Sequence, residues 1–248
     1  MRYFIELSYN GRAYHGWQNQ PNAITVQEVI ENALSILLKE EISIVGAGRT
    51  DTGVHALQMF AHFDHENEIE CNQLVFKLNA FLPKDISIQN VFQVEKEAHA
   101  RFDAISRTYV YKLTFVKNAF SYNNTYYIKQ QLDIDKMNQA SDLLVQYNNF
   151  KCFSRSNTDV KTYNCELKKA VWEMKDEELI FTIKADRFLR NMVRAIVGTF
   201  IEIGLGKIEI DQLKTIIESK DRTNAGASAP AHALYLEKIE YPQTIKLS

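Results

Sequence analysis

The stretch Gly46-Ala47-Gly48-Arg49-Thr50-Asp51-Thr52-Gly53-Val54-His55-Ala56 joins two apolar runs, residues 42–45 before it and residues 54–63 after it. Three of the nine glycines in the chain lie within it. Because glycine adopts backbone conformations that other residues resist, the stretch predicts a tight and specified connection between two strands.

One arginine, Arg49, and one aspartate, Asp51, lie between these glycines and give the first indication of chemistry. A guanidinium this close to a carboxylate favours the ionised form of the carboxylate. An ionised aspartate serves as a nucleophile or as a base. A plain hairpin turn in which Asp51 bonds its own backbone accounts for the same residues. The choice between these interpretations depends on the rest of the chain.

The residues on either side of the stretch predict a β-α-β-β-α-β order. Alternation of side chains after Met1 predicts a strand, and Thr25 with Glu28 forms a capping box at the start of an apolar helical face. The predicted elements are a strand at 2–9, a helix at 26–38, strands at 42–45 and 54–63, a helix at 74–81 and a strand at 86–94. This order is the ferredoxin-like split unit.

The second half of the chain predicts a similar order. Asp133 matches an N-cap, and a later amphipathic helix ends at Gly204. The predicted elements are a strand at 107–116, a helix from residue 134, a hairpin of strands at 161–174 and 179–185, helices at 189–201 and 211–219, and a strand at 234–239, with loops at 117–127 and 154–157. The predicted fold class is therefore α+β, with two ferredoxin-like βαββαβ halves at residues 1–104 and 105–248.

Composition limits the class of protein. The net charge of −2 provides no global cationic field, so a nucleic acid would have to bind a local basic face. The three cysteines, an odd number spaced far apart, exclude a disulfide framework and lack zinc-ligand spacing, which fits a reducing cytosol. No apolar stretch is long enough for a signal sequence or a membrane span. We therefore expect a cytoplasmic protein that does not contact membranes.

Arg187, Arg190 and Arg194 recur at spacings of three and four residues, which places them on one side of the predicted helix. A solvated cationic face explains any one of them. Three arginines with no interleaved acid suit a polyanion or a buried carboxylate.

A second basic stretch has tyrosines interleaved with its cations. It contains Arg101, Arg107, Tyr109, Tyr111, Lys112 and Lys117. Bases stack on aromatic rings while cations bind phosphates, so the mixture suits RNA, although a core position on the strand explains Tyr109 equally well. We expect His55 and Trp17 to pack or to anchor loops.

Three classes of function fit these features. There is no Gly-rich phosphate loop followed by a helix, no metal-ligand cluster and no nucleophile elbow. The pattern therefore favours a reaction on RNA without cofactor or metal. A non-catalytic RNA-binding module is the main alternative, but it has no use for a carboxylate such as Asp51 that repels phosphates. An unrelated α/β hydrolytic enzyme is disfavoured by the missing motifs.

Several motifs resemble the tRNA pseudouridine synthase A (TruA) family, from about residue 3 to residue 241. The similar segments are 47–56, 9–11, 16–20, 99–104, 107–111, 188–194, 196–198 and 229–236. The resemblance implies that Asp51 is the nucleophile, with Arg194 as its basic partner. It also implies that Tyr109 stacks on the uracil and is a candidate acceptor of the C5 proton. Arg49, Arg190 and Arg101 are the further candidates for substrate binding.

The family converts uridine to pseudouridine in the tRNA anticodon arm, at positions 38, 39 and 40. The resemblance therefore implies an isomerase without cofactor or metal. It also implies a homodimer that binds tRNA across both subunits, and two ferredoxin-like halves with antiparallel sheets around a central active-site cleft. The chain departs from the family pattern at Thr52, at Ala233 and at Asn148-Asn149.

Overall fold

A computed structural model of the chain describes residues 1–155 and 160–245, so the last two residues of the predicted loop 154–157 lie outside it. The chain forms two compact units. The first contains residues 1–105 together with the C-terminal segment from Tyr235, and the second contains residues 106–234. The sequence pattern assigned the C-terminal segment to the second half, because periodicity does not show which strand an element pairs with.

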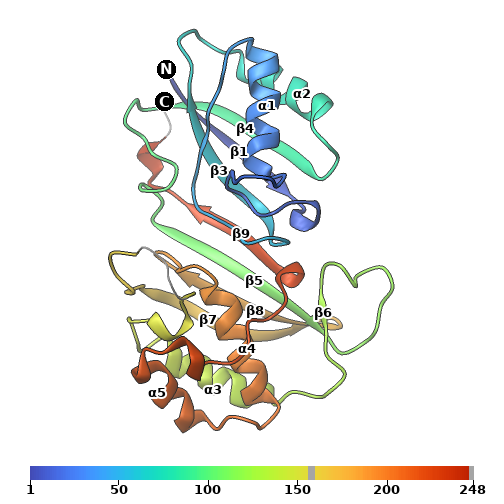
Figure 1. The fold of residues 1–248 in the computed structure, drawn as a ribbon, viewed down its shortest axis with the longest axis vertical. Coiled ribbons are helices and arrows are strands. Elements are labelled where there is room, and N and C mark those ends of the chain that lie inside the picture. Colours follow the sequence, from blue (N-terminus) through green and yellow to red (C-terminus); the bar gives the residue numbers. More distant parts are fainter. Residues whose placement is uncertain (156–159, 246–248) are drawn as a thin grey trace. The chain divides into compact units, whose positions relative to one another are not determined.

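The first unit has the predicted β-α-β-β-α-β order, followed by a strand from the C-terminus (Figure 1). Its elements are β1 (Arg2–Tyr9), α1 (Val26–Leu38), β2 (Val45–Gly46), β3 (His55–Asp64), α2 (Cys71–Phe81), β4 (Ile86–Val94) and β9 (Leu234–Glu240). The strands follow the order β4-β1-β3-β9, and β2 pairs with β3. β1 is antiparallel to both β3 and β4, whereas β9 is parallel to β3.

The predicted strand at 42–45 is wrong in most of its length, because β2 contains only Val45 and Gly46. The backbone N–H groups before it bond side chains of α1 instead of a neighbouring strand. That of Ile42 donates to Ser35 Oγ and that of Ile44 to Glu31 Oε1, both at 2.9 Å. Buried backbone groups need a partner, and here the helix supplies it.

Side-chain caps define the helix starts of the first unit. Thr25 Oγ1 accepts the N–H of Glu28 at 3.3 Å, which confirms the predicted start of α1. Glu70 accepts the N–H of Gln73 at 2.8 Å, so α2 begins three residues before the predicted position. The helix still ends before Pro83, as predicted.

The core of the first unit buries both faces of β1. Tyr3, Ile5 and Leu7 on one face are at most 1% exposed. Phe4 on the other face is fully buried as well, because Tyr241 from the C-terminal segment packs edge-on against it at 5.5 Å between ring centroids. The strand therefore does not have the solvent face that a simple alternation suggests.

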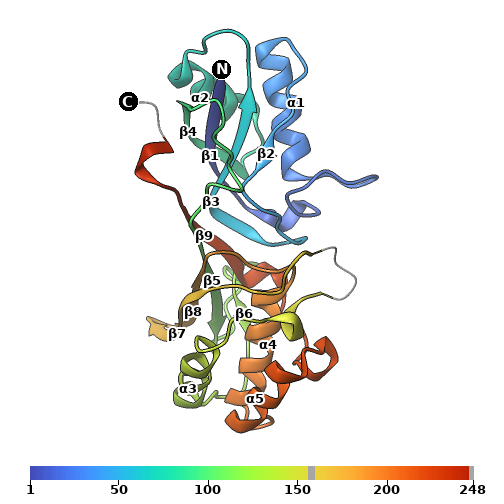
Figure 2. The ribbon, with the colours of Figure 1, turned by 90° about the vertical axis from the view of Figure 1, so that its left-hand side faces the viewer.

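The described part of the second unit contains three α-helices and a sheet that is antiparallel except for the pairing of β6 with β5. Its elements are β5 (Ser106–Thr114), β6 (Tyr126–Tyr127), α3 (Ile134–Leu144), β7 (Leu167–Lys175), β8 (Glu178–Ala185), α4 (Met192–Gly204) and α5 (Ile210–Ser219). The strand order is β5-β8-β7, with β6 parallel to β5. The three helices lie beside one another (Figures 1 and 2). None of the helices in the described part of the chain is long and apolar enough to cross a membrane.

Aromatic packing joins the sheet of the second unit to α4. Trp172 of β7 stacks on Phe181 of β8 at 4.6 Å, and Phe181 meets Phe200 of α4 edge-on at 5.7 Å. Asp133 caps α3 by accepting the N–H of Lys136 at 3.0 Å, as predicted. The predicted hairpin is confirmed, but its first strand begins at Leu167, six residues later than predicted.

Candidate active site

Asp51 lies in a four-residue turn between β2 and β3. The N–H of Val54 donates to the carbonyl oxygen of Asp51 at 3.1 Å, and Gly53 has a φ of +78°. A positive φ at the third residue is the feature of a type II turn, which glycine adopts without strain. Asp51 is partly exposed and Arg49 is exposed. The predicted tight connection is confirmed, and Asp51 is partly exposed within it.

Thr50, immediately before Asp51, is bonded by both its side chain and its backbone. The hydroxyl groups of Tyr9 and Thr50 are 2.9 Å apart, and the N–H of Trp17 donates to the Thr50 carbonyl at 3.4 Å. Gly16 lies so close to this carbonyl, with a φ of +88°, that a Cβ would collide with it. The loop 10–18 therefore positions the N-terminal side of the Asp51 turn.

The loop 10–18 also contacts Val54 and His55, on the C-terminal side of Asp51. The backbone of Gly11 leaves no room for a Cβ beside the Val54 carbonyl. Its N–H donates to His55 Nδ1 at 3.1 Å, and the buried His55 ring stacks on Tyr235 at 4.8 Å. The structure thus gives His55 the predicted anchoring role.

Sequence reasoning assigned no role to Tyr9, Gly11 and Gly16, although all three lie in the quoted N-terminal motifs. The available signal was two glycines within a loop rich in aromatic residues, since such glycines mark close backbone approaches. What they approach, the residues on either side of Asp51, depends on the tertiary structure.

Tyr109 lies on β5, opposite Ile183 of β8. Its ring meets that of Phe188 at 88°, with 5.1 Å between centroids. Tyr109 is partly exposed, whereas Tyr111, two residues along the same strand, is fully buried. Tyr109 is therefore a supported aromatic ring that remains accessible to a ligand.

Arg194 is the third residue of α4 and is fixed by a pair of hydrogen bonds. Its Nε donates to the carbonyl of Ala229 at 2.7 Å, and the N–H of Ala229 donates to the carbonyl of Arg194 at 2.9 Å. The first turn of α4 contains no acidic residue. A cation is unfavourable at the positive end of a helix dipole, so this position suits the binding of an anion.

Arg194 also lies near the tyrosine strand β5. The hydroxyl of Tyr111 on β5 donates to the carbonyl of Pro230 at 2.9 Å, next to the Ala229 carbonyl that accepts from Arg194. Tyr111 is two residues from Tyr109. Two of the predicted site residues, Tyr109 and Arg194, therefore belong to one neighbourhood of the second unit.

The prediction that Arg187 and Arg190 share a helix face with Arg194 is wrong, because α4 begins only at Met192. Asp186 Oδ1 accepts the N–H of Arg187 at 2.7 Å, which stabilises a loop after β8. Asn191 then adopts a left-handed conformation with a φ of +65°. Arg190 is exposed in this loop. Helical spacing therefore does not relate the three arginines.

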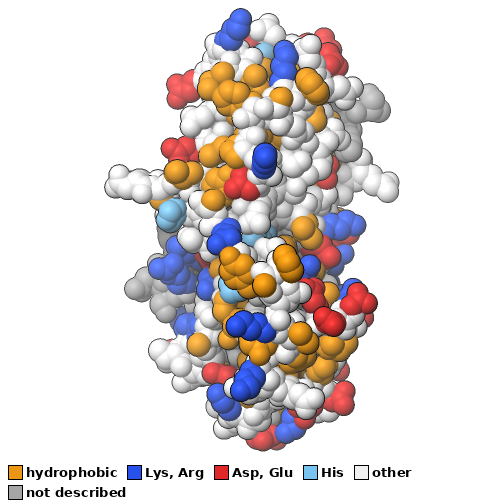
Figure 3. Space-filling view, turned by 90° about the vertical axis from the view of Figure 1, so that its right-hand side faces the viewer, with side chains coloured by type: hydrophobic (Ala, Val, Ile, Leu, Met, Phe, Trp, Pro, Cys, Tyr) orange, Lys and Arg blue, Asp and Glu red, His pale blue; other side chains and the backbone are white. Residues whose placement is uncertain are grey.

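The basic and aromatic stretch around β5 is only partly a surface for a ligand. Arg107 Nη1 donates to the carbonyl of Asp186 at 2.8 Å, and Lys112 lies 3.9 Å from the carboxylate of Glu178. In the following loop, Phe120 is 97% exposed. Figure 3 shows such hydrophobic side chains at the surface, interspersed with Lys and Arg side chains.

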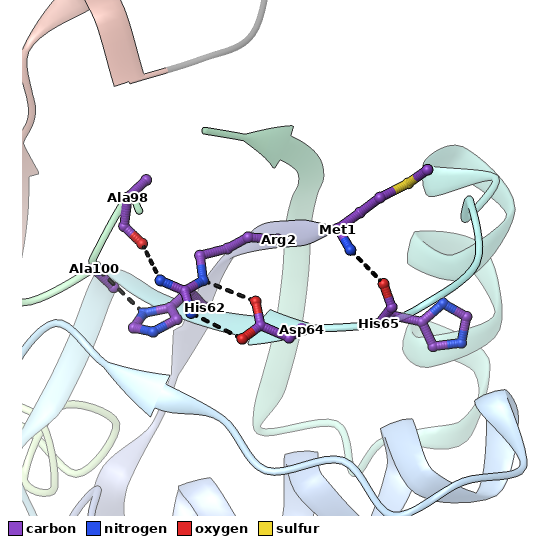
Figure 4. Close-up of polar contacts among 7 residues, drawn as sticks. All are labelled: Met1, Arg2, His62, Asp64, His65, Ala98 and Ala100. Carbon is purple, nitrogen blue, oxygen red and sulfur yellow. Dashed lines mark hydrogen bonds and ion pairs between the residues drawn. The ribbon is translucent and has the colours of Figure 1, made fainter. Parts of the chain in front are cut away.

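Arg101 lies in a turn. Polar contacts of the preceding residues Ala98 and Ala100 attach this turn to β1 and β3 (Figure 4). Arg2 forms an ion pair with Asp64 at 2.8 Å and donates through Nη1 to the carbonyl of Ala98 at 3.0 Å. The N–H of Ala100 donates to Nδ1 of His62 at 3.1 Å. These contacts order the backbone that carries the exposed Arg101.

Arg101 follows a residue that contacts β3 away from the Asp51 turn. Its neighbour Ala100 contacts His62, whereas Asp51 lies just before His55, seven residues earlier on β3. At about 3.3 Å per residue, the two points on the strand are about 23 Å apart. Arg101 therefore follows a residue attached to a part of β3 that is distant from the end at which the Asp51 turn lies.

The chain is similar to known proteins over nearly its whole length. A family model described as tRNA pseudouridine synthase matches residues 7–103 and 140–242. A protein named tRNA pseudouridine synthase A from Parabacteroides distasonis is 52% identical over 247 residues, which cover 98% of this chain and 97% of the relative. A protein of the same name from Bacteroides fragilis is 51% identical over 246 residues, 98% of each chain. One from Thermoanaerobacter pseudethanolicus is 41% identical over 240 residues, 96% of this chain and 98% of the relative.

Proposed function

Since the chain belongs to the tRNA pseudouridine synthase A family and is an isomerase, we propose that it converts uridine to pseudouridine in tRNA, in the anticodon arm at positions 38, 39 and 40. The observation that carries the proposal is the Asp51 turn. Thr50 and Val54, on either side of it, are each contacted by the loop 10–18, and Asp51 itself remains partly exposed. A plain connecting turn does not require such support.

In the proposed reaction the target uridine leaves the stem before chemistry, because its glycosidic bond cannot be reached while the base is stacked. The Asp51 carboxylate attacks the ribose or the base, and the bond between C1′ and N1 breaks. The uracil rotates and its C5 bonds to C1′. The bond that the Asp51 carboxylate formed to the ribose or the base breaks, which restores the ionised carboxylate. C5 then loses its proton and N1 gains one, so the formula of the nucleotide is unchanged. No redox step or group donor is needed.

The other site residues have supporting roles in this proposal. Arg194 stabilises the ionised carboxylate of Asp51, and Tyr109 stacks on the uracil and accepts the C5 proton. Arg49 either replaces the flipped base in the stem or binds its phosphate, while Arg190 and Arg101 bind phosphates elsewhere on the tRNA. The accessible ring of Tyr109 and the anion-favouring position of Arg194 support these assignments.

The proposal extends to the architecture. We propose that the two units are ferredoxin-like halves that flank a central cleft, that the protein is a cytoplasmic homodimer, and that tRNA binds across both subunits. The β-α-β-β-α-β order of the first unit and the resemblance of the motifs support this arrangement.

Tritium release from an anticodon arm made with C5-tritiated uridine tests the function. The native chain should release tritium, because C5 loses its proton in the reaction. Asp51→Asn should bind the arm normally and release none. Asp142→Asn, the same change at an exposed position of α3, is the matched control and should behave as the native chain.

Two results would contradict the proposal in different ways. Substantial turnover by Asp51→Asn would exclude Asp51 as the nucleophile. If the native chain and Asp51→Asn bound the arm equally, with the same salt dependence, and neither released tritium, the chain would be an RNA-binding module for this substrate.

A further inference from the structure

The segment 225–230, here called the strap, runs beside the start of α4 and carries the carbonyl that binds Arg194. At Ala229 the strap and α4 exchange hydrogen bonds: Arg194 Nε donates to the Ala229 carbonyl at 2.7 Å, and the Ala229 N–H donates to the Arg194 carbonyl at 2.9 Å. A guanidinium is planar, so fixing the direction of its Nε–H also fixes the plane in which its Nη atoms lie. The position of the strap therefore determines the orientation of Arg194.

The first part of the strap is fixed against the body of α4. The N–H of Gly226 donates to Oγ1 of Thr199 at 2.9 Å, and Thr199 is fully buried. Gly198 lies so close to the carbonyl of Ala227 that a Cβ would collide with it. A glycine on this face of the helix allows the strap to approach.

Ser228 in the middle of the strap receives two hydrogen bonds. Asn191 Nδ2 donates to its Oγ at 2.6 Å, and Arg222 Nη2 donates to the same oxygen at 3.0 Å. Asn191 is the N-cap residue of α4, yet its side chain does not cap the helix. An N-cap side chain normally accepts a backbone N–H of the first helical turn, which stabilises the helix. The Asn191 side chain bonds the strap instead, and such departures from local stability concentrate at functional sites.

Tyr111 fixes the end of the strap. Its hydroxyl donates to the carbonyl of Pro230 at 2.9 Å, next to the carbonyl that binds Arg194. Every residue from Gly226 to Pro230 thus has a contact with α4, with the turn before it or with β5. A loop that only connects two elements at the surface does not need a contact at every residue.

We infer that Asn191, Ser228 and Tyr111 are positioning residues: they fix the strap, and the Ala229 carbonyl of the strap orients the guanidinium of Arg194. The inference rests on the proposed function for its catalytic consequence. Its structural content, an immobilised Nε–H of Arg194, does not depend on that function.

Solvent exchange of the Arg194 Nε–H, followed by NMR and assigned by its loss in Arg194→Lys, tests the structural content. In the native chain this proton should exchange slowly. In Tyr111→Phe and in Ser228→Ala it should exchange at least 10-fold faster, while the matched control Tyr3→Phe, which removes another buried hydroxyl that accepts the N–H of Ile69, should leave it unchanged. Slow exchange retained in both variants would overturn the inference.

Single-turnover pseudouridine formation tests the catalytic consequence. Tyr111→Phe should slow the reaction about 10-fold without changing the Kd for tRNA. In an Arg194→Lys background, which lacks the oriented guanidinium, the same change should cause no further loss. An equal fold-loss in both backgrounds would mean that Tyr111 acts only through general structure. An inactive native chain would instead overturn the proposed function, and the exchange measurement would still decide the positioning role.

Discussion

The hydroxyl groups of Tyr9 and Thr50 lie 2.9 Å apart and join the end of β1 to the residue before Asp51. Removing one hydroxyl should loosen the Asp51 turn while the fold persists, because a single hydrogen bond contributes only about 1 kcal/mol. We expect Tyr9→Phe to lower the rate of pseudouridine formation at saturating tRNA about 10-fold, with little change in KM. Steady-state kinetics checks this. A native rate in Tyr9→Phe would show that the bond does not position the turn.

Gly16 and Gly48 should differ in their sensitivity to the same substitution. Gly16 has a φ of +88° and leaves no room for a Cβ beside the Thr50 carbonyl, whereas a Cβ at Gly48 would meet nothing within 4 Å. Gly16→Ala should therefore destabilise the protein by about 1–3 kcal/mol, since strain and a steric collision add. Gly48→Ala should change the free energy of unfolding by less than about 0.5 kcal/mol. Urea denaturation of both variants is the measurement, and equal stabilities would contradict the packing described.

Two substitutions at Tyr109 separate stacking from proton transfer. Tyr109→Phe keeps an aromatic ring beside Phe188 but removes the hydroxyl. It should bind tRNA normally and lose most turnover if the hydroxyl accepts the C5 proton. Tyr109→Leu also removes the stacking surface, which is worth about 1–3 kcal/mol per base, so it should weaken binding as well. Binding and tritium release measured on both variants decide the role. Full activity in Tyr109→Phe would exclude proton transfer by the hydroxyl.

Arg101 should affect binding alone, because its neighbour Ala100 contacts His62, about 23 Å along β3 from His55 at 3.3 Å per residue. Arg101→Ala should raise the Kd for tRNA several-fold and reduce the steepness of its salt dependence by about one phosphate contact. The single-turnover rate at saturating tRNA should not change. A binding titration at several salt concentrations checks this, and a loss of rate without a loss of affinity would refute it.

Acid should destabilise the first unit through His62. Burial, followed by the nearby charges of Arg2 and His99, lowers the pKa of His62 to about 4, while Asp64 and Asp103 act in the opposite direction. The unfolded chain therefore binds a proton on this side chain before the folded chain does. The stability due to neutral His62 is complete above pH 6.5 and is lost as the pH falls toward 4, by at most about 3 kcal/mol.

His62→Asn tests this dependence, because the amide oxygen can still accept the N–H of Ala100 but does not titrate. The urea concentration at the unfolding midpoint of the native chain should decrease as the pH is lowered from 7 to 5. The midpoint of the variant should decrease less. The ion pair of Arg2 and Asp64 lowers the pKa of Asp64 and adds a further loss of stability at lower pH in both proteins. Parallel curves over the whole range would exclude His62 as the cause.

Local patterns determined much of this protein. Alternation identified β1, the oxygen of Thr25 marked the start of α1, and the glycines around Asp51 predicted the tight turn, because strand period, helix caps and glycine conformations depend on neighbouring residues. The same locality explains the errors. Ile42 and Ile44 have the composition of a strand, but their N–H groups bond side chains of α1, and the apparent helical spacing of Arg187 and Arg190 is interrupted at Asn191.

Only the tertiary structure decided what surrounds the candidate site residues. The contacts of Thr50 with Tyr9, of Val54 with Gly11, and of Arg194 with Ala229 join residues 35 to 43 positions apart in the chain. No periodicity links residues at such separations, since each contact follows from how strands and helices pack. The sequence by itself therefore determined which residues to examine, the Asp51 turn above all. The folded chain determined that the turn is supported on both sides and that a strap orients Arg194.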